Sequence, residues 1–353
     1  MTPLLPSAYP PSTAPLLAAI SLPISIAIIL NRIRATMTRQ ARLSSIRLSN
    51  AETISRMPGT PVAVFVGGTS GIGQGMAEAF ARWRGGRAHI VIVGRNEDAA
   101  ADILAHLPKP SRDGEQASTN WTHEFIPCDV SLMSKVHAAS QLIASKYSKV
   151  NFLILSAGFL STTGRDETSE GLDKKLALHY YSRWKLICEL EPALRKAKGE
   201  GEEARVLSIL VAGKGARLDL EDLGLEKRYS AARVRGQAIT YNDYMIESFY
   251  ARNPEITFTH AHPGGVDTPL MDVSPSPWMR AMAYVVLPIF RPLLTSKEDC
   301  AEYMWHGLLE NAGAMPRRIR WDGTVIDDAS WSGDEEAGRI LWEHTEKATT
   351  VEG

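Results

Sequence analysis

The chain has 353 residues, more than one ordinary α/β domain needs to build its core. Charged residues make up 22% of it and the formal net charge is -1, so it lacks the basic excess of a general nucleic-acid binder. Its three cysteines, Cys128, Cys188 and Cys300, are too scattered for a disulfide framework or a zinc site. We therefore expect no metal and no nucleic-acid partner, and cysteines that are buried small hydrophobic residues in a reducing compartment.

The N-terminal segment, residues 1–31, contains no charged side chain. It is apolar from Pro15 to Leu30 except for two serines, which is slightly short for a membrane span of about 20 residues. Arginines follow, and the positive-inside rule keeps that side of a span cytosolic. We expect a membrane anchor, in the endoplasmic reticulum, with the globular part in the cytosol.

The next segment, residues 32–60, is rich in arginine and serine up to residue 50 and has no acid before Glu52. Its apolar residues are spaced for an amphipathic helix, so it is either a basic linker or a helix in the membrane interface. The same composition fits an organelle-targeting segment, which keeps mitochondrial and cytoplasmic locations open. A cleaved signal peptide fits less well, because a positive n-region is missing.

From Pro61 onward, short runs rich in valine and isoleucine alternate with helical patterns such as 72–84 and 131–147. The predicted strands are 62–66, 88–93, 122–127, 151–155, 205–211 and 256–262. Runs that are apolar on both faces are typical of a buried parallel sheet. The pattern predicts a doubly wound parallel α/β sheet, a Rossmann fold, as a single catalytic domain over residues 61–345 with a tail at 346–353.

Two segments interrupt this pattern. Residues 107–120 are polar and rich in turn residues, which predicts a surface loop. Residues 275–294 are strongly apolar but contain prolines, and three interpretations are open: a substrate lid, a second membrane contact, or a helix packed on the domain.

A glycine-rich turn follows the first predicted strand directly, with the sequence Gly67-Gly68-Thr69-Ser70-Gly71-Ile72-Gly73. Glycines permit a tight turn and let the backbone approach a pyrophosphate, while the next helix presents free N–H groups to it. We predict that a dinucleotide contacts Gly67, Thr69, Ser70, Gly71, Ile72 and Gly73. The alternative is a turn that serves only the structure.

The second predicted strand ends in Val93-Gly94-Arg95-Asn96. An acid near this place would bind the ribose 2′-hydroxyl of NAD, whereas a cation suits the 2′-phosphate of NADP. We therefore predict NADP(H), bound in part by Arg95 and Asn96. The alternative is an exposed arginine at a strand end, and the acidic Glu97 and Asp98 follow it.

Several motifs in residues 61–345 resemble the short-chain dehydrogenase/reductase family. Cys128-Asp129-Val130 falls where the family has an aspartate near the adenine, and Leu155-Ser156-Ala157-Gly158 resembles its Asn-Asn-Ala-Gly. Pro263-Gly264-Gly265-Val266-Asp267-Thr268 resembles its Pro-Gly-x-Val-x-Thr, whose threonine holds the nicotinamide carboxamide. The resemblance adds Asp129, Ser156, Ala157, Gly158, Pro263, Val266 and Thr268 to the predicted cofactor contacts. Other segments resemble the retinol-dehydrogenase-like branch and fungal members of secondary-metabolite pathways.

The family's catalytic asparagine, serine, tyrosine and lysine are only partly matched. Its Tyr-x-x-x-Lys aligns with Tyr241 through Met245, so the lysine is lost. Val211 takes the place of the serine, with Ser208 on the opposite face of the strand, and His179 takes that of the asparagine. We predict Tyr241 as the proton donor, and His179 as either a relay that titrates near physiological pH or a buried hydrogen-bonding residue.

The resemblance implies an NADP(H)-dependent oxidoreductase that interconverts a ketone and a secondary alcohol on a lipophilic, secondary-metabolite substrate. The alternative is a catalytically degenerate dinucleotide-binding protein that acts as a scaffold, a sensor or a non-redox enzyme in the same pathway. A membrane and a second copy of the chain, in a homodimer, are the other expected partners.

Overall fold

The computed structural model describes residues 37–110, 120–272, 274, 276–309, 316–326 and 333–351. The chain divides into two units, Met1–Arg47 and Leu48–Gly353. The predicted anchor, residues 1–31, lies outside the described residues, and residues 37–47 of the first unit are helical. No helix in the described ranges combines the length and the apolar character needed to cross a bilayer.

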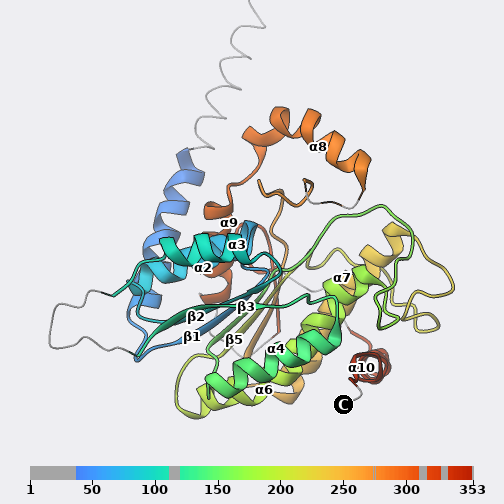
Figure 1. Ribbon diagram of the computed structural model, residues 1–353, viewed down its shortest axis with the longest axis horizontal. Coiled ribbons are helices and arrows are strands. Elements are labelled where there is room, and N and C mark those ends of the chain that lie inside the picture. Colours follow the sequence, from blue (N-terminus) through green and yellow to red (C-terminus); the bar gives the residue numbers. More distant parts are fainter. Residues whose placement is uncertain are drawn as a thin grey trace, which may run out of the picture. The chain divides into compact units, whose positions relative to one another are not determined.

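A seven-stranded parallel sheet lies at the centre of the second unit (Figure 1), in the order β3-β2-β1-β4-β5-β6-β7. The strands are β1 (Val62–Val66), β2 (His89–Gly94), β3 (Thr122–Pro127), β4 (Phe152–Leu155), β5 (Arg205–Ile209), β6 (Thr257–Ala261) and β7 (Arg317–Ile319). This architecture confirms the predicted doubly wound parallel sheet. The six predicted strands are present, and β7 was not predicted because its Arg-Arg-Ile sequence contains no apolar run.

Helices cover both faces of the sheet, which explains why the central strands are apolar on both faces. In Figure 1, α2, α3 and α9 lie on one face and α4, α6, α7 and α10 on the other. The longer helices are α2 (Gly71–Arg84), α3 (Glu97–His106), α4 (Met133–Lys146), α6 (Ser182–Gly199), α7 (Ala231–Arg252), α8 (Pro277–Phe290), α9 (Lys297–Leu309) and α10 (Glu335–Thr349). Trp305 of α9 stacks on Phe80 of α2 with ring centres 5.4 Å apart, which fixes α2 against α9.

Three segments differ from, or add detail to, the sequence predictions. A short helix, α5 (Lys174–Leu176), leads into a π-helical turn, Ala177–Tyr181, which continues into α6. Helix α10 continues to Thr349, inside the segment predicted as a tail, because Thr345 and Thr349 are buried. Of the three free cysteines, Cys128 and Cys300 are buried and Cys188 is partly exposed.

The strand order reverses between β1 and β4. In doubly wound sheets, the carboxyl ends of the strands leave a crevice at this reversal, and ligands bind there. The turns after β1, β2, β3, β4 and β6 contain the predicted cofactor residues, so the topology directs them to one edge of the sheet.

Candidate dinucleotide site

The turns that follow β1 and β4 are in direct contact. Gly67 has a left-handed φ of 83°, and a Cβ atom there would lie 2.5 Å from the backbone nitrogen of Ala157. A Cβ atom on Gly73 would lie 2.3 Å from Oγ of Ser156 and 2.6 Å from the carbonyl oxygen of Gly67. Only glycine fits these two places, so the predicted turn brings backbone close to backbone at the reversal of strand order.

The first turn of α2 has no side-chain cap. Ser70 is the extended residue before the helix and its side chain makes no capping hydrogen bond. The first N–H groups of a helix have no partner inside the helix, so here they can donate to a phosphate. Thr268 lies beside this end of α2, because its Cγ2 is 3.1 Å from the position of a Cβ atom on Gly71. These residues fit the diphosphate and the adjoining part of a dinucleotide.

The turn after β4 is held to the turn after β1 and to His179. Ser156 Oγ donates to the carbonyl oxygen of Val66 at 3.0 Å. The imidazole Nε2 of His179 lies 3.3 Å from the position of a Cβ atom on Gly158 and accepts a hydrogen bond from the Phe159 N–H at 3.2 Å. The structure therefore brings Ser156, Gly158 and His179 together, as the resemblance implies.

The residues predicted at the adenine end lie where β2 and β3 stop. Arg95 and Asn96 are exposed, and the Asn96 side chain caps α3 by accepting from the Ala99 N–H at 3.1 Å. Asp129 Oδ1 accepts from the backbone N–H and the hydroxyl of Ser131 at 3.0 and 2.7 Å. The side chains of Asn96 and Asp129 thus stabilise the turns in which they lie, and Arg95 is an exposed cation next to Asn96.

The segment after β6 carries the last predicted contacts. Val266 forms a parallel bridge with Thr295, and the carbonyl oxygen of Pro263 lies 3.9 Å from Sγ of Cys300. These contacts hold the segment against the start of α9. Within it, Thr268 reaches Gly71, whereas Pro263 and Val266 support the backbone.

The structure does not support Tyr241 as the proton donor. Its side chain is fully buried, its hydroxyl donates to the carbonyl oxygen of Leu223 at 3.0 Å, and its ring packs on Tyr180 at 5.0 Å. Burial, followed by the nearby tyrosines, raises the pKa of Tyr241 well above its usual value. The sequence match was misleading because Tyr241 lies on the face of α7 that packs into the core, against Tyr180.

His179 is not a relay that titrates near physiological pH. Burial of the ring, with the positive charges of Arg183 and Lys175, lowers the pKa of His179 to about 3. The ring is therefore neutral, and because Nε2 accepts a hydrogen bond, the proton lies on Nδ1. Of the two interpretations of His179, the structure favours the hydrogen-bonding histidine.

A buried polar network behind the β4 turn was missed in the sequence. Arg183 donates to Oγ of Ser208 and to the carbonyl oxygens of Ile209 and Ala157, each at 2.8 Å. Ser208 donates to Oδ1 of Asn242 at 2.6 Å, and Asn242 donates to the carbonyl oxygen of His179 at 2.8 Å. One signal was available: Arg183 is a charged residue within the aromatic run Tyr180-Tyr181-Ser182-Arg183-Trp184.

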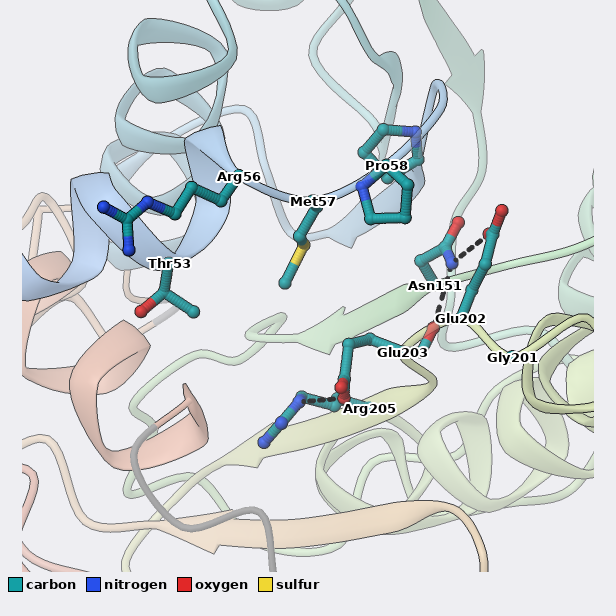
Figure 2. Close-up of a pocket in the computed structure, with 10 residues that line it drawn as sticks. Thr53, Arg56, Met57, Pro58, Asn151, Gly201, Glu202, Glu203 and Arg205 are labelled. Carbon is teal, nitrogen blue, oxygen red and sulfur yellow. Dashed lines mark hydrogen bonds and ion pairs between the residues drawn. The ribbon is translucent and has the colours of Figure 1, made fainter.

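A separate pocket lies at the opposite edge of the sheet, near the amino ends of β1, β4 and β5 (Figure 2). Its polar groups are paired with one another: Asn151 Nδ2 donates to Glu202 Oε2 at 2.9 Å, and Arg205 Nε donates to Glu203 Oε2 at 2.9 Å. The predicted cofactor residues lie at the carboxyl ends of the strands, so this pocket is not part of the candidate site.

Comparisons with known proteins agree with this geometry. Residues 61–209 match the model of the short chain dehydrogenase family. An oxidoreductase of Emericella nidulans is 30% identical over 86% of this chain and 96% of its own length. An oxidoreductase of Emericella variicolor is 32% identical over 74% of this chain and 73% of its own length. Human polyprenol dehydrogenase is 26% identical over 59% of this chain and 61% of its own length.

Two solved structures share the fold. A 3-ketoacyl-(acyl-carrier-protein) reductase from Brucella melitensis, complexed with NADH, has a TM-score of 0.52 and 19% identity, and covers 75% of this chain and 98% of its own. An NADPH-bound carbonyl reductase from chicken fatty liver also has a TM-score of 0.52, with 16% identity, and covers 76% of this chain and 99% of its own. The fold, the glycine turn and these relatives together show that the chain belongs to the short-chain dehydrogenase/reductase family and is an oxidoreductase of that type.

Proposed function

We propose that this protein is an NADP(H)-dependent oxidoreductase that interconverts a ketone and a secondary alcohol on a lipophilic substrate of fungal secondary metabolism. The uncapped start of α2, framed by Gly67 and Gly73, is the observation that carries the proposal. Arg95 at the end of β2 supports NADP(H) over NAD(H), because no acid stands at that position. The name of the human relative, a polyprenol dehydrogenase, supports a lipophilic substrate, and the Emericella sources of the other two relatives support a fungal one.

When bound, the reduced nicotinamide would supply a hydride to a carbonyl carbon, and the carbonyl oxygen would take its proton from water. The N–H groups at the start of α2 would hold the diphosphate, and Thr268 would orient the nicotinamide end of the cofactor. His179 adds a neutral hydrogen-bonding group next to Gly158. Tyr241 and Met245 take no part in this proposal, because both side chains are buried in the core.

We expect purified protein to oxidise NADPH slowly when supplied with a panel of lipophilic ketones. Turnover on the order of tenfold to thousandfold below that of ordinary enzymes is expected, because the family's tyrosine and lysine do not supply the proton here. The loss of NADPH absorbance measures the rate. Tight NADPH binding without turnover on any ketone would contradict catalysis and support the second candidate.

That second candidate is a dinucleotide-binding protein without hydride chemistry, which acts as a scaffold, a sensor or a non-redox enzyme. The Tyr241 hydroxyl, held by Leu223 inside the core, is the observation that favours it. A folded protein that ignores both NADPH and NADH would rule out both candidates and leave the glycine turn with a structural role alone.

The cofactor preference is tested by replacing Arg95 with aspartate. We expect NADPH binding to weaken by about tenfold to a hundredfold, because a charge-assisted contact to the 2′-phosphate is replaced by repulsion. NADH binding is expected to change by less than about threefold, since NADH has no phosphate at that place. Fluorescence titration of the two cofactors measures both constants. Arg87→Asp is a matched control, because Arg87 is also exposed but lies before β2.

We also propose that α8 contacts a lipid surface. Trp278, Met282, Val285 and Ile289 are 42% to 71% exposed and recur at intervals that place them on one stripe of the helix. No acidic residue lies between Asp272 and Glu298, a stretch that contains Arg280, Arg291 and Lys297. An exposed apolar stripe in a stretch without carboxylates suits an anionic membrane interface.

A fluorophore attached at Val285→Cys is expected to be quenched by vesicles of anionic lipid that carry a nitroxide quencher. Val285 is 65% exposed and lies on the apolar stripe of α8, whereas Leu142 is an exposed apolar residue of α4 and provides the matched control at Leu142→Cys. Equal quenching at both places would contradict a contact through α8.

A homodimer and location at the endoplasmic reticulum stay proposals, which light scattering and a fluorescent fusion of the full chain would check.

A further inference from the structure

Arg183 is a buried cation whose hydrogen-bond partners are all uncharged. Its side chain is 2% exposed, and its guanidinium donates to a hydroxyl and to two carbonyl oxygens, of Ser208, Ile209 and Ala157. In the part of the chain that the structure describes, no carboxylate lies within ion-pair distance of it. Buried charges are ordinarily paired, because removing a charge from water is costly. An unpaired guanidinium inside a folded domain therefore calls for a functional reason.

The charge lies directly behind the candidate site. Arg183 holds the carbonyl oxygen of Ala157, and the backbone nitrogen of the same residue is the closest neighbour of Gly67 in the dinucleotide turn. The charge also reaches His179, since after burial of the ring it is the largest cause of that histidine's lowered pKa. The turn after β4 therefore lies in a region of positive electrostatic potential. The sequence pattern does not suggest this potential, because the family's lysine is missing from it.

We infer that Arg183 is a positioning residue whose unpaired charge makes the site prefer the reduced cofactor over the oxidised one. The inference rests on the proposed binding of NADP(H). The oxidised nicotinamide ring is a cation and the reduced ring is neutral, so an uncompensated positive charge nearby penalises only the oxidised form. The same field favours negative charge that develops on a carbonyl oxygen during reduction. The site is thus built for the reductive direction.

Arginine also shapes the turn, through the fork of its guanidinium. One nitrogen reaches Ser208 and Ile209 on β5, and the other reaches Ala157 after β4. Lysine keeps the charge but cannot reproduce a planar fork, whereas methionine keeps much of the length and removes the charge. The two substitutions therefore separate the effect of charge from that of geometry.

The test compares the dissociation constants of NADPH and NADP+ by fluorescence titration of the full chain. Wild-type protein is expected to prefer NADPH, and Arg183→Met should shift the ratio of the two constants about threefold to thirtyfold toward NADP+. Arg183→Lys should keep the wild-type ratio even where both affinities fall. Arg195→Met, which removes a surface cation of the same helix that is paired with Glu191, should leave both constants unchanged.

A purely structural role predicts that Arg183→Met weakens both cofactors equally, and an unchanged ratio would overturn the inference. If Arg183→Met does not fold, Ser208→Asp supplies the same test, because it places a carboxylate where the Ser208 hydroxyl now meets Arg183. Neutralising the guanidinium in this way should shift the ratio in the same direction, and no shift would again overturn the inference. Failure of the folded wild-type chain to bind either cofactor would instead refute the proposed function.

Discussion

Replacing Gly73 with alanine is expected to weaken NADPH binding by at least about a hundredfold, or about 2.7 kcal/mol. The added Cβ atom would lie 2.6 Å from the carbonyl oxygen of Gly67, which belongs to the backbone of the turn and cannot rotate away. The turn must therefore open, and the N–H groups of α2 move away from the diphosphate. We expect a loss of about 1–3 kcal/mol in the free energy of unfolding as well. Fluorescence titration and urea denaturation measure the two effects.

Gly199→Ala is the matched control for this substitution. Gly199 lies at the end of α6, and a Cβ atom there meets no other atom within 4 Å. Cofactor affinity should be unchanged, and the helix should gain up to about 1 kcal/mol from the better helix former. A Gly73→Ala protein that binds NADPH as tightly as wild type would show that this turn does not seat the diphosphate.

Replacing Asp243 with asparagine is expected to lower the free energy of unfolding by about 3–5 kcal/mol. Asp243 is buried, and its Oδ1 accepts hydrogen bonds from His260 Nδ1 at 2.7 Å and from Arg318 Nε at 2.8 Å. Without the carboxylate, Arg318 loses its buried ion pair with Asp243 and keeps its contact with the partly exposed Glu247. The expected loss is a large part of the roughly 5–15 kcal/mol that stabilises a typical domain. Chemical denaturation of both proteins measures it.

Asp334→Asn is the control, because Asp334 is an exposed cap of α10 and asparagine caps a helix about as well as aspartate. That protein should differ from wild type by less than about 0.5 kcal/mol. An Asp243→Asn protein that unfolds at the same denaturant concentration as wild type would contradict the importance of the buried cluster of Asp243, His260 and Arg318.

The buried cluster of Asp243, His260 and Arg318 also predicts how the stability of the protein depends on pH. Burial alone would raise the pKa of Asp243, but the charge and hydrogen bond of His260, and then those of Arg318, outweigh it and hold that pKa below its ordinary value of 3.8. A carboxyl group with a lowered pKa in the folded state stabilises the fold above its unfolded pKa and loses this contribution as the pH falls through its folded pKa. Wild-type protein should therefore lose stability below about pH 4, and Asp243→Asn should lose less.

The fold could be predicted from the sequence because the patterns that indicate it involve residues close together in the chain. The predicted strands that became β1, β2 and β4 contain continuous apolar runs, and the glycine turn needs only neighbouring residues to be recognised. Strand β7 escaped prediction because Arg318 becomes a buried residue only after Asp243 of α7 meets it. Its place in the sheet depends on contacts between residues far apart in the chain, and the hydrophobic pattern of the sequence does not show such contacts.

For a similar reason, the sequence points to the turns of the candidate site but not to its catalytic groups. The turns predicted to bind the cofactor are recognised from neighbouring residues, whereas catalytic roles depend on which way a helix faces. Tyr241 matches the tyrosine of the family's Tyr-x-x-x-Lys, but in the structure its side chain is buried in the core. The sequence does not reveal the role of Arg183, because its partners on β5 and in the turn after β4 are 25 or 26 residues away in the chain.

The π-helical turn at Ala177–Tyr181 has a consequence for how such a site can evolve. A π turn contains one residue more than an α turn, so every side chain after it is rotated by about 100° relative to an uninterrupted helix. Arg183 follows this turn by two residues and faces the sheet in that rotated phase. Losing a single residue here would swing the guanidinium away from β5, so the length of this turn is as much a determinant of the site's electrostatics as the arginine itself.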